Sequence, residues 1–460
     1  MNITEDIYQA SNLTMDQLLF WTGQRIEPGN AMFQMGSLCT IEGPIELSHL
    51  RVAFQAVLDS SDALRTVIEE RQGVPYQRVL DEVHYELDYV DFSGQLDPRG
   101  AAFGWAGERC RRPLDLKSRM FDSVLLKMSE YEYGWYLCLH HLICDGWSFS
   151  IATERLAAAY DLSRKGRLAE FFGDYPRFAE YLEFERAYHR SARYGEAEAY
   201  WKKKFSVVGE QPRFYGSVAQ ITTTEVARVS RELPEASVEA LAMMASKPEL
   251  LAVSANSGIA SIFLAIALAF LYRITGSRRI TVGLAIQNRR SKKFKETIGL
   301  FVHFLPLQIS IDDDDTFLSL AAKVRDEIHA SARYASYSVP NSVQNRIYDV
   351  VFNYIVASHG DFNGARARTH WIHSGSGGEA IGIHLEDISR SGKLVINLDL
   401  HHDVFDEDQR SHAADTFFNM IEAFLRDAEG IVTRPDLLAP EAPNQVSEFL
   451  EEELAFDFTL

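Results

Sequence analysis

The stretch that most constrains the fold is an apolar segment that ends in two adjacent histidines. Residues 132–140, "EYGWYLCLH", have the alternation of a β-strand, and the turn "HLICDG" follows at once. Residues 148–166, "SFSIATERLAAAYDLSRKG", then have the spacing of a helix. A strand, a polar turn and a helix in this order present side chains at a strand end, where loops carry binding and catalytic groups.

Strand-like and helix-like segments are mixed along the whole chain, which predicts an α/β fold. At 460 residues, the chain is too long for one ordinary core and suits two domains or two similar halves. Ser148 or Ser150 is the expected N-cap of the helix after the histidines, and Gly166 its expected end. The main further expectations are strands at 64–70, 121–128, 222–233, 278–286, 348–356 and 393–403, helices at 46–60, 175–204, 261–272, 316–335 and 408–428, and loops at 358–369 and 373–380.

Composition excludes several classes of protein. Four cysteines show neither metal-ligand spacing nor a disulfide framework, which favours a reducing cytoplasm. A net charge of −19 argues against non-specific binding to nucleic acid or to a membrane surface. The N-terminus lacks the layout of a signal peptide, and the apolar run at 259–272 is shorter than a membrane span, so we expect a buried helix there.

Metal and thiol chemistry are poorly supported at the histidine turn. Adjacent residues of a strand point to opposite faces, so His140 and His141 cannot both bind one ion without distortion, and no metal is expected. Cys144 could act as a nucleophile paired with His141. However, no glycine elbow or positive charge is visible nearby to lower the pKa of its thiol.

Acid–base chemistry needs fewer assumptions. An imidazole with a pKa of about 6.5 accepts a proton from an amine or a hydroxyl at neutral pH. Asp145 could fix the turn through a buried ion pair, and Gly146 could let a substrate approach the backbone. A well-paired polar turn without catalysis explains the pattern equally well. A second "HH-x-x-x-D" at 401–406 has Glu407 in place of the glycine and shows that the pattern alone decides nothing.

The turn resembles the HH-x-x-x-DG signature of the condensation domains of nonribosomal peptide synthetases, within the chloramphenicol acetyltransferase-like superfamily. Further segments are similar to other motifs of that family and occur in the same order. They are "LTMDQLLFW" (13–21), "DSSDALRTVIEE" (59–70), "RRPLDL" (111–116), "GDYPRFAEYLEFER" (173–186), "VGLAIQNRR" (282–290), "IGLFVHFLPLQI" (298–309) and "YDVVFNYI" (348–355).

The resemblance implies two acetyltransferase-like halves that form a V with a tunnel between them. We expect the first half at 1–175, the second at 176–435 and an acidic linker and tail at 436–460. A carrier protein would deliver a thioester on its phosphopantetheine, and the acceptor would be an amine or an alcohol, either free or carrier-bound. No bound cofactor, nucleic acid or membrane is implied.

The same resemblance assigns roles to the residues of the turn. His141 would face the tunnel as the general base or position the nucleophile, and the amide of Gly146 would orient the thioester or its oxyanion. Asp145 would pair with Arg289 across the halves, while His140 would be structural. The chain would therefore be an acyltransferase that forms an amide or an ester bond in the biosynthesis of a peptide antibiotic or another natural product.

Several motifs depart from the family pattern. In the opening motif, Met15 replaces an alanine and Asp16 looks inserted, while Ala285 replaces a proline and His303 stands where asparagine is usual. The chain begins and nearly ends with this unit, so we expect a free-standing condensation enzyme. A coenzyme A-dependent acyltransferase of the same superfamily, or a degenerate domain that serves as a binding scaffold, are the alternatives.

Overall fold

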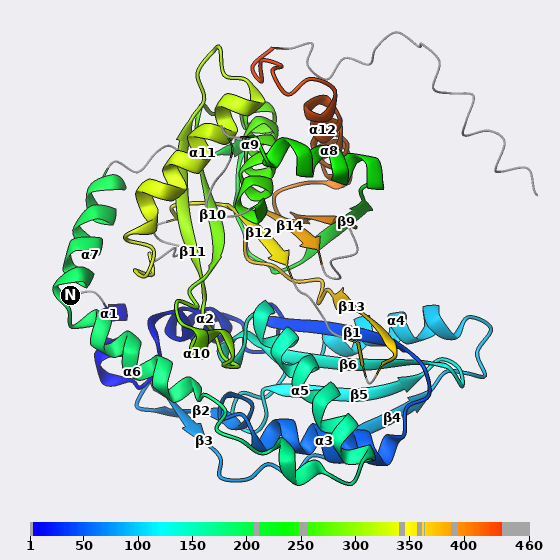
Figure 1. Cartoon of the computed structure of the whole chain (residues 1–460). Coiled ribbons are helices and arrows are strands. Elements are labelled where there is room, and N and C mark those ends of the chain that lie inside the picture. Colours follow the sequence, from blue (N-terminus) through cyan, green and yellow to red (C-terminus); the bar gives the residue numbers. More distant parts are fainter. Residues whose placement is uncertain are drawn as a thin grey trace, which may run out of the picture.

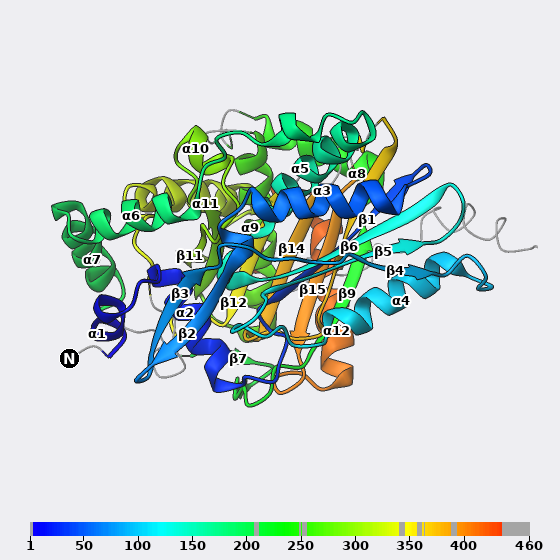
Figure 2. The same ribbon diagram turned by 90° about the horizontal axis from the view of Figure 1, so that it is seen from below.

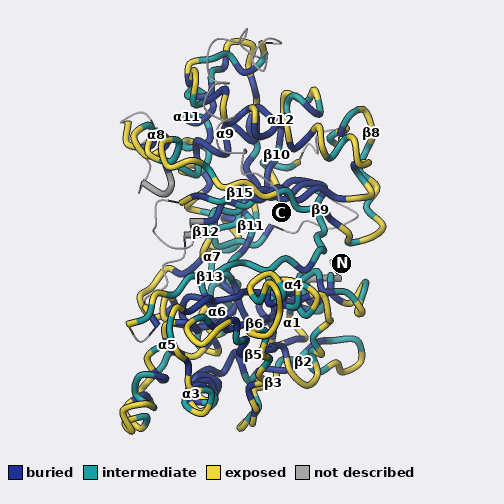
Figure 3. Tube along the Cα trace, turned by 90° about the vertical axis from the view of Figure 1, so that its right-hand side faces the viewer, coloured by how far each residue is buried: buried dark blue, intermediate teal, exposed yellow. Residues whose placement is uncertain are grey.

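Two β-sheets organise the chain, one in each half (Figure 1). The structure is a computed structural model that describes residues 3–206, 211–247, 250, 255–339, 346–356, 361–362, 364–387 and 393–434. The segment 436–460, for which we expect a linker and tail, lies outside these residues. Burial is concentrated inside each half, around its sheet (Figure 3).

The sheet of the first half has five strands in the order β13–β1–β6–β5–β4. Helices α3 and α5 lie side by side on one face and build an apolar core with it, and α4 packs on the opposite face (Figure 2). The bounds are β1 (Gln34–Glu42), β4 (Asp88–Asp91), β5 (Phe121–Lys127), β6 (Glu132–His140), β13 (Arg366–Ile372), α3 (Leu47–Asp59), α4 (Pro98–Cys110) and α5 (Gly146–Arg164).

The sheet of the second half has six strands in the order β11–β10–β12–β14–β15–β9. Four helices cover the face that points away from the first half (Figure 1). The bounds are β9 (Val226–Glu232), β10 (Arg279–Gln287), β11 (Val302–Ser310), β12 (Val350–Val356), β14 (Ile381–Asp387), β15 (Val395–His401), α8 (Glu235–Ala245), α9 (Ala255–Thr275), α11 (Phe317–Ala332) and α12 (Glu407–Arg426).

Helix α9 is the central helix of the second core. Its window Gly258–Thr275 is long and apolar enough to cross a membrane, but 72% of that window is buried inside the protein. The core around it includes residues of the four helices and of the sheet. The prediction of a buried helix at 259–272 is therefore confirmed.

Several segments beyond residue 176 join the first half. Helices α6 (Phe178–His189) and α7 (Ala192–Lys204) replace the single helix expected at 175–204, and Phe178 of α6 belongs to the first core. Short helix α10 (Lys292–Lys295) and the residues up to Phe301 pack there as well. These connections hold the second half against the first.

Strand β13 corrects the expectation of a loop at 358–369. It pairs antiparallel with β1 over its whole length, from Gly36 opposite Ile372 to Glu42 opposite Arg366. Its sequence, RARTHWI, has three apolar residues in seven and no regular alternation, and its partner strand lies more than 300 residues earlier in the chain. Because a strand at the edge of a sheet is stabilised by its partner, the local pattern did not reveal it.

The remaining elements are short. Helix α1 (Ile3–Ala10) and helix α2 (Met15–Ile26) precede β1, and the hairpin of β2 (Thr66–Arg71) and β3 (Val74–Val79) lies beside the first half. A second small hairpin joins β7 (Arg213–Phe214) to β8 (Ser217–Val218). Of these, α2 matters most for the site, because it contacts the histidine turn.

Candidate functional site

His140 ends β6 and is buried, with only 1% of its surface exposed. Its Nδ1 accepts a hydrogen bond from the backbone N–H of Leu142 at 3.1 Å. Nε2 therefore carries the proton and donates to Oε1 of Gln24, 3.1 Å away. Burial lowers the pKa of His140 to about 3, so the ring is neutral and both nitrogens are occupied within the protein.

His141 begins the turn that follows β6 and is only half-buried. Its Nδ1 lies 3.3 Å from the carbonyl oxygen of Cys144, which can only accept, so Nδ1 carries the proton and Nε2 keeps its lone pair. Burial lowers the pKa of His141 to about 4, although the nearby Asp145 raises it. The ring is thus a neutral proton acceptor at physiological pH.

Phe20 fixes the plane of the His141 ring. The two rings stack with centroids 4.9 Å apart, and Phe33 meets Phe20 edge-on at 5.2 Å. The backbone N–H of His141 also donates to the carbonyl of Phe33 at 2.8 Å. Sequence reasoning missed both phenylalanines: Phe20 lies inside the motif-like segment 13–21 but not at one of its defining positions, and Phe33 lies in no motif.

Asp145 is the N-cap of α5, which corrects the prediction of Ser148 or Ser150 in that role. Its Oδ1 accepts from the backbone N–H of Ser148 at 3.0 Å and from the Ser148 hydroxyl at 2.9 Å. Its Oδ2 accepts from the backbone N–H of Phe301 at 3.1 Å. Ser148 occupies the third helical position of a capping box, so the helix starts at Gly146.

The structure brings Asp145 and Arg289 together. The Nη2 of Arg289 lies 2.7 Å from Oδ1 of Asp145, and the two side chains are 1% and 2% exposed. The guanidinium also donates to the carbonyls of Phe294, Thr297 and Gly299, and it lies 4.0 Å from the ring centre of Phe301. This buried ion pair ties the start of α5 to the segment that precedes β11.

Gly146 starts α5 beneath the indole of Trp371. A Cβ built on Gly146 would lie 4.0 Å from two atoms of that indole, which is ordinary contact. Trp371 comes from β13 and meets Phe149 of α5 edge-on at 4.9 Å. Sequence reasoning missed Trp371, because it follows directly on a segment that reads as a loop.

His303 and Asp16 lie close to each other, although the sequence suggested no link between them. His303 Nε2 donates to the carbonyl of Ala335, and its Nδ1 lies 3.8 Å from Oδ2 of Asp16. Asp16 looked inserted in the sequence, but it belongs to the regular first turn of α2.

A polar cluster lies on the face of the second sheet that the four helices leave uncovered. Arg228 and Asp399 form a bidentate ion pair with distances of 2.7 and 2.8 Å. Nε2 of His384 and of His373 lie 3.3 and 3.4 Å from the same Oδ2 of Asp399. Burial opposes ionisation of Asp399, but the bonds from Arg228 and His384 lower its pKa. This cluster also escaped sequence reasoning.

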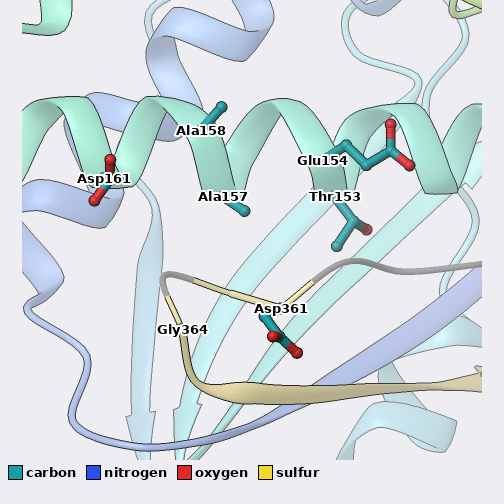
Figure 4. A pocket seen from close by; sticks show the side chains of 7 residues that line it. All are labelled: Thr153, Glu154, Ala157, Ala158, Asp161, Asp361 and Gly364. Carbon is teal, nitrogen blue, oxygen red and sulfur yellow. The ribbon is translucent and has the colours of Figure 1, made fainter.

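Cys144 and a pocket beside α5 are two further features that could carry a function. Cys144 is buried and its Sγ donates to the carbonyl of His140 at 3.3 Å, and burial raises the pKa of its thiol well above the usual value. A thiol in this state is a poor nucleophile. A pocket of about 390 Å³ is lined by Asp361, by Gly364 and by one side of α5, which contributes Thr153, Glu154, Ala157, Ala158 and Asp161 (Figure 4). It lies along α5, beyond the first two turns that follow the histidines.

Two halves, each built around a mixed sheet, and an HH-x-x-x-DG turn at the end of β6 are the features expected from the resemblance to chloramphenicol acetyltransferase-like proteins. The family model of the condensation domain matches residues 8–446, which is nearly the whole chain. The chain therefore belongs to the condensation domain family.

Curated relatives are large synthetases of which this chain matches a part. It is 22% identical over 455 residues to a dimodular nonribosomal peptide synthase of Bacillus subtilis, covering 96% of this chain and 18% of the relative. It is 23% identical over 443 residues to surfactin synthase subunit 1 of the same organism, covering 93% and 12%. The chain thus spans less than a fifth of the length of either relative.

Solved structures of condensation domains share the fold. The first condensation domain of the calcium-dependent antibiotic synthetase, in complex with a substrate analogue, is 23% identical with a TM-score of 0.79, covering 91% of this chain and 97% of that chain. The starter condensation domain of rhizomide synthetase RzmA, as a mutant in complex with C8-CoA, is 22% identical with a TM-score of 0.81, covering 91% and 96%.

Proposed function

We propose that this chain transfers an acyl or aminoacyl group from the phosphopantetheine thioester of a carrier protein to an amine or a hydroxyl. The product is an amide or an ester in the assembly of a nonribosomal peptide or a related natural product. The observation that carries this proposal is the state of His141. Its ring is neutral, its Nδ1–H faces the Cys144 carbonyl, and Phe20 fixes its plane, which leaves Nε2 as a proton acceptor.

The chemistry follows from that lone pair. The acceptor amine attacks the thioester carbonyl while Nε2 of His141 takes one of its protons, or positions it for the attack. The C–S bond then breaks, and the leaving phosphopantetheine sulfur takes up the proton, so that a free thiol and an amide result. The backbone N–H of Gly146, at the positive end of α5, is the proposed donor to the carbonyl oxygen as negative charge develops on it.

The other site residues are proposed as supports. Both ring nitrogens of His140 form hydrogen bonds within the protein, so this residue stabilises the turn and does not transfer a proton. Asp145 caps α5 and pairs with Arg289, which fixes Gly146 and joins the two halves. Within the described residues, both ring nitrogens of His140 and both carboxylate oxygens of Asp145 already have hydrogen-bond partners in the protein.

We further propose the setting in which the reaction takes place. Each half, 1–175 and 176–435, contributes one wall of a tunnel in which the thioester and the acceptor meet. The acceptor is free or held on a second carrier. The chain acts in the cytoplasm and needs no bound cofactor. The similarity to a nonribosomal peptide synthase and to a surfactin synthase subunit supports the reaction class.

Use of a coenzyme A thioester is the second candidate function. It is favoured by the solved complex of the RzmA starter condensation domain, a structural neighbour, with C8-CoA. Coenzyme A ends in the same phosphopantetheine arm as a carrier protein, so the chemistry at His141 would be unchanged.

A single-turnover assay separates the two donors. The same acyl group is offered on a carrier protein and on coenzyme A with one acceptor amine, and the product is followed by mass spectrometry. We expect faster transfer from the carrier and loss of transfer in His141→Ala. A strong preference for coenzyme A would overturn the carrier-dependent function. Full activity of His141→Ala would overturn the role of His141, and the absence of transfer from either donor would favour a binding scaffold.

A further inference from the structure

Two of the four cysteines lie side by side near the end of β6. Cys110 is the last residue of α4, and Cys138 stands two residues before His140 in β6. The two cysteines are 0% and 1% exposed, and both belong to the apolar cluster between α4 and the first sheet. Both are free thiols. The proposed reaction uses neither of them.

Gly36 of β1 leaves room for the two sulfur atoms to approach each other. It stands directly opposite Cys138 in the pairing of β1 with β6. Side chains at such opposite positions lie on the same face of the sheet, with about 4.5–5.5 Å between their Cβ atoms. A Cβ built on Gly36 would meet the Sγ of Cys110 at 2.8 Å, so this sulfur fills the space that the glycine leaves open. The Sγ of Cys110 therefore lies next to the side chain of Cys138.

Hydrogen bonds hold both thiols in place. The amide nitrogen of Gln34 lies 3.9 Å from the Sγ of Cys138 and donates to the carbonyl of Cys110 at 3.0 Å. The Sγ of Cys110 donates to the carbonyl of Ile372 at 3.7 Å. Contact with the Cys138 thiol lowers the pKa of Cys110, while contact with Cys110 raises the pKa of Cys138 well above its usual value. Cys110 is thus the more readily ionised thiol of the two.

The end of α4 gives an oxidant a route to the sulfur of Cys110. Arg111 is the C-cap of this helix, and residues 111–113 are exposed. The last turn of a helix frays, and such local opening requires far less free energy than unfolding of the whole domain. The sulfur of Cys110 can therefore meet a small oxidant while the sheet stays folded.

We propose that Cys110 and Cys138 form a redox-sensitive pair, which closes to a disulfide in the presence of a peroxide, displaces the histidine turn and lowers acyl transfer. The effect on acyl transfer rests on the proposed function, whereas the disulfide does not. Both residues stay thiols in a reducing cytoplasm, so the protein is active until peroxide accumulates.

The peroxide is the two-electron oxidant of this reaction. The thiolate of Cys110 attacks one oxygen of hydrogen peroxide, the O–O bond breaks, and a sulfenic acid forms. The hydroxide that leaves takes up the proton that the Cys110 thiol had lost and becomes water. The sulfur of Cys138 then attacks the sulfenic sulfur and the S–O bond breaks. The departing oxygen takes the Cys138 proton and leaves as a second water.

The disulfide would act on the histidine turn through two strands. A bond of about 2.05 Å between the sulfurs draws the end of α4 towards β6, where Cys138 and His140 are two residues apart. Oxidation also removes the S–H proton that the carbonyl of Ile372 accepts. Ile372 follows Trp371 in β13, and the indole of Trp371 lies beside Gly146. We therefore expect the turn to shift from both sides.

Thiol mapping tests the pair directly. The full chain is treated with hydrogen peroxide, the remaining thiols are alkylated in urea, and unreduced peptides are analysed by mass spectrometry. We expect one cross-linked peptide pair that contains Cys110 and Cys138, while Cys39 and Cys144 are alkylated. Dithiothreitol should restore all four thiols.

The rate of acyl transfer tests the consequence. A displacement of about 1 Å at an active site can cost up to about 10²-fold in rate, so we expect the oxidised wild type to be about tenfold slower and dithiothreitol to restore it. Cys110→Ala and Cys138→Ala should keep their rates under peroxide, with urea unfolding as the check that each is folded. Cys39→Ala is the matched control, because Cys39 is buried in the other core of the same half, and it should respond to peroxide as the wild type does.

A spectroscopic measurement follows the histidine turn without any substrate. In protein with isotope-labelled histidine, the NMR signal of His141 is assigned with His141→Ala. This signal should move on oxidation of the wild type and of Cys39→Ala, and it should stay in place in Cys110→Ala.

The outcomes distinguish this proposal from the proposed function. Four free thiols after peroxide treatment, or a disulfide between other cysteines, would overturn the pair. A disulfide between Cys110 and Cys138 that leaves the rate and the His141 signal unchanged would overturn the switch. A disulfide that moves the signal in a protein without acyl transfer would overturn only the condensation reaction and the effect on it. Acyl transfer by a protein whose thiols never pair would do the reverse.

Discussion

Replacing Asp145 by asparagine should destabilise the first half without acting through proton transfer. The Asp145 carboxylate accepts hydrogen bonds from Ser148, Phe301 and Arg289, and its side chain is 2% exposed. Asparagine keeps one acceptor oxygen for the helix cap but leaves the Arg289 guanidinium as an uncompensated buried charge. Breaking a buried pair in this way costs about 3–5 kcal/mol, and we expect the lower end because the cap survives.

Urea unfolding followed by tryptophan fluorescence measures this effect, with each transition analysed separately because the chain has two cores. Asp313→Asn is the matched control. Asp313 also pairs with an arginine, Arg278, but its side chain is 86% exposed, so we expect a loss of about 0–1 kcal/mol. The double variant Asp145→Asn/Arg289→Met should recover part of the lost stability, because it removes the unpaired charge.

One result would refute this reasoning. If Asp145→Asn unfolded at the wild-type urea concentration but lost turnover and changed the pH dependence of the remaining rate, Asp145 would be part of a proton relay. The structural role predicts the opposite combination, a less stable protein whose folded fraction keeps a wild-type pH dependence.

Four further predictions concern the histidine turn. Because the pKa of His141 is lowered to about 4, kcat/KM in a pH–rate profile should decrease on the acid side near pH 4 rather than near pH 6.5. A decrease near pH 6.5 would contradict this. The unfolding free energy should decrease as pH falls from about 6.5 towards 4, because in this range His140 and His141 bind protons in the unfolded chain but stay neutral in the folded protein. A flat dependence in urea titrations would argue against it. Phe20→Ala should raise the pKa of His141 and move the acid limb of the pH–rate profile to higher pH. Gly146→Ala should fold normally, because Trp371 leaves room for the added methyl group. It should nevertheless lower turnover about tenfold or more if the substrate approaches the backbone N–H of residue 146.

The sequence predicted the elements whose local pattern matches their burial. The strand 132–140 and the helix after it, the buried helix at 259–272 and most other long elements were visible because their apolar residues follow the period of a strand or a helix. The pairing of Asp145 with Arg289 came from the family resemblance, and the structure places the two side chains in contact.

Features that depend on contacts between distant segments could not be predicted. Strand β13 exists because β1 pairs with it, and Trp371 reaches the site only through that pairing. Aspartate and serine are both good N-cap residues, so Asp145 and Ser148 both fit the local sequence at the start of α5. Which of them caps the helix depends on where the preceding turn ends, and the sequence does not give that position. The stacking of Phe20 on His141 and the approach of Asp16 to His303 join residues more than 100 positions apart.

The central claim is that neutral His141 assists acyl transfer from a thioester. The most direct measurement is a single-turnover reaction in which an acyl-carrier protein and an acceptor amine are mixed with the wild type or with His141→Ala, and the loss of acyl group from the carrier is followed by intact-protein mass spectrometry. We predict that His141→Ala transfers the group about 10²–10⁴-fold more slowly while it remains folded. Equal rates for the two proteins would contradict the account.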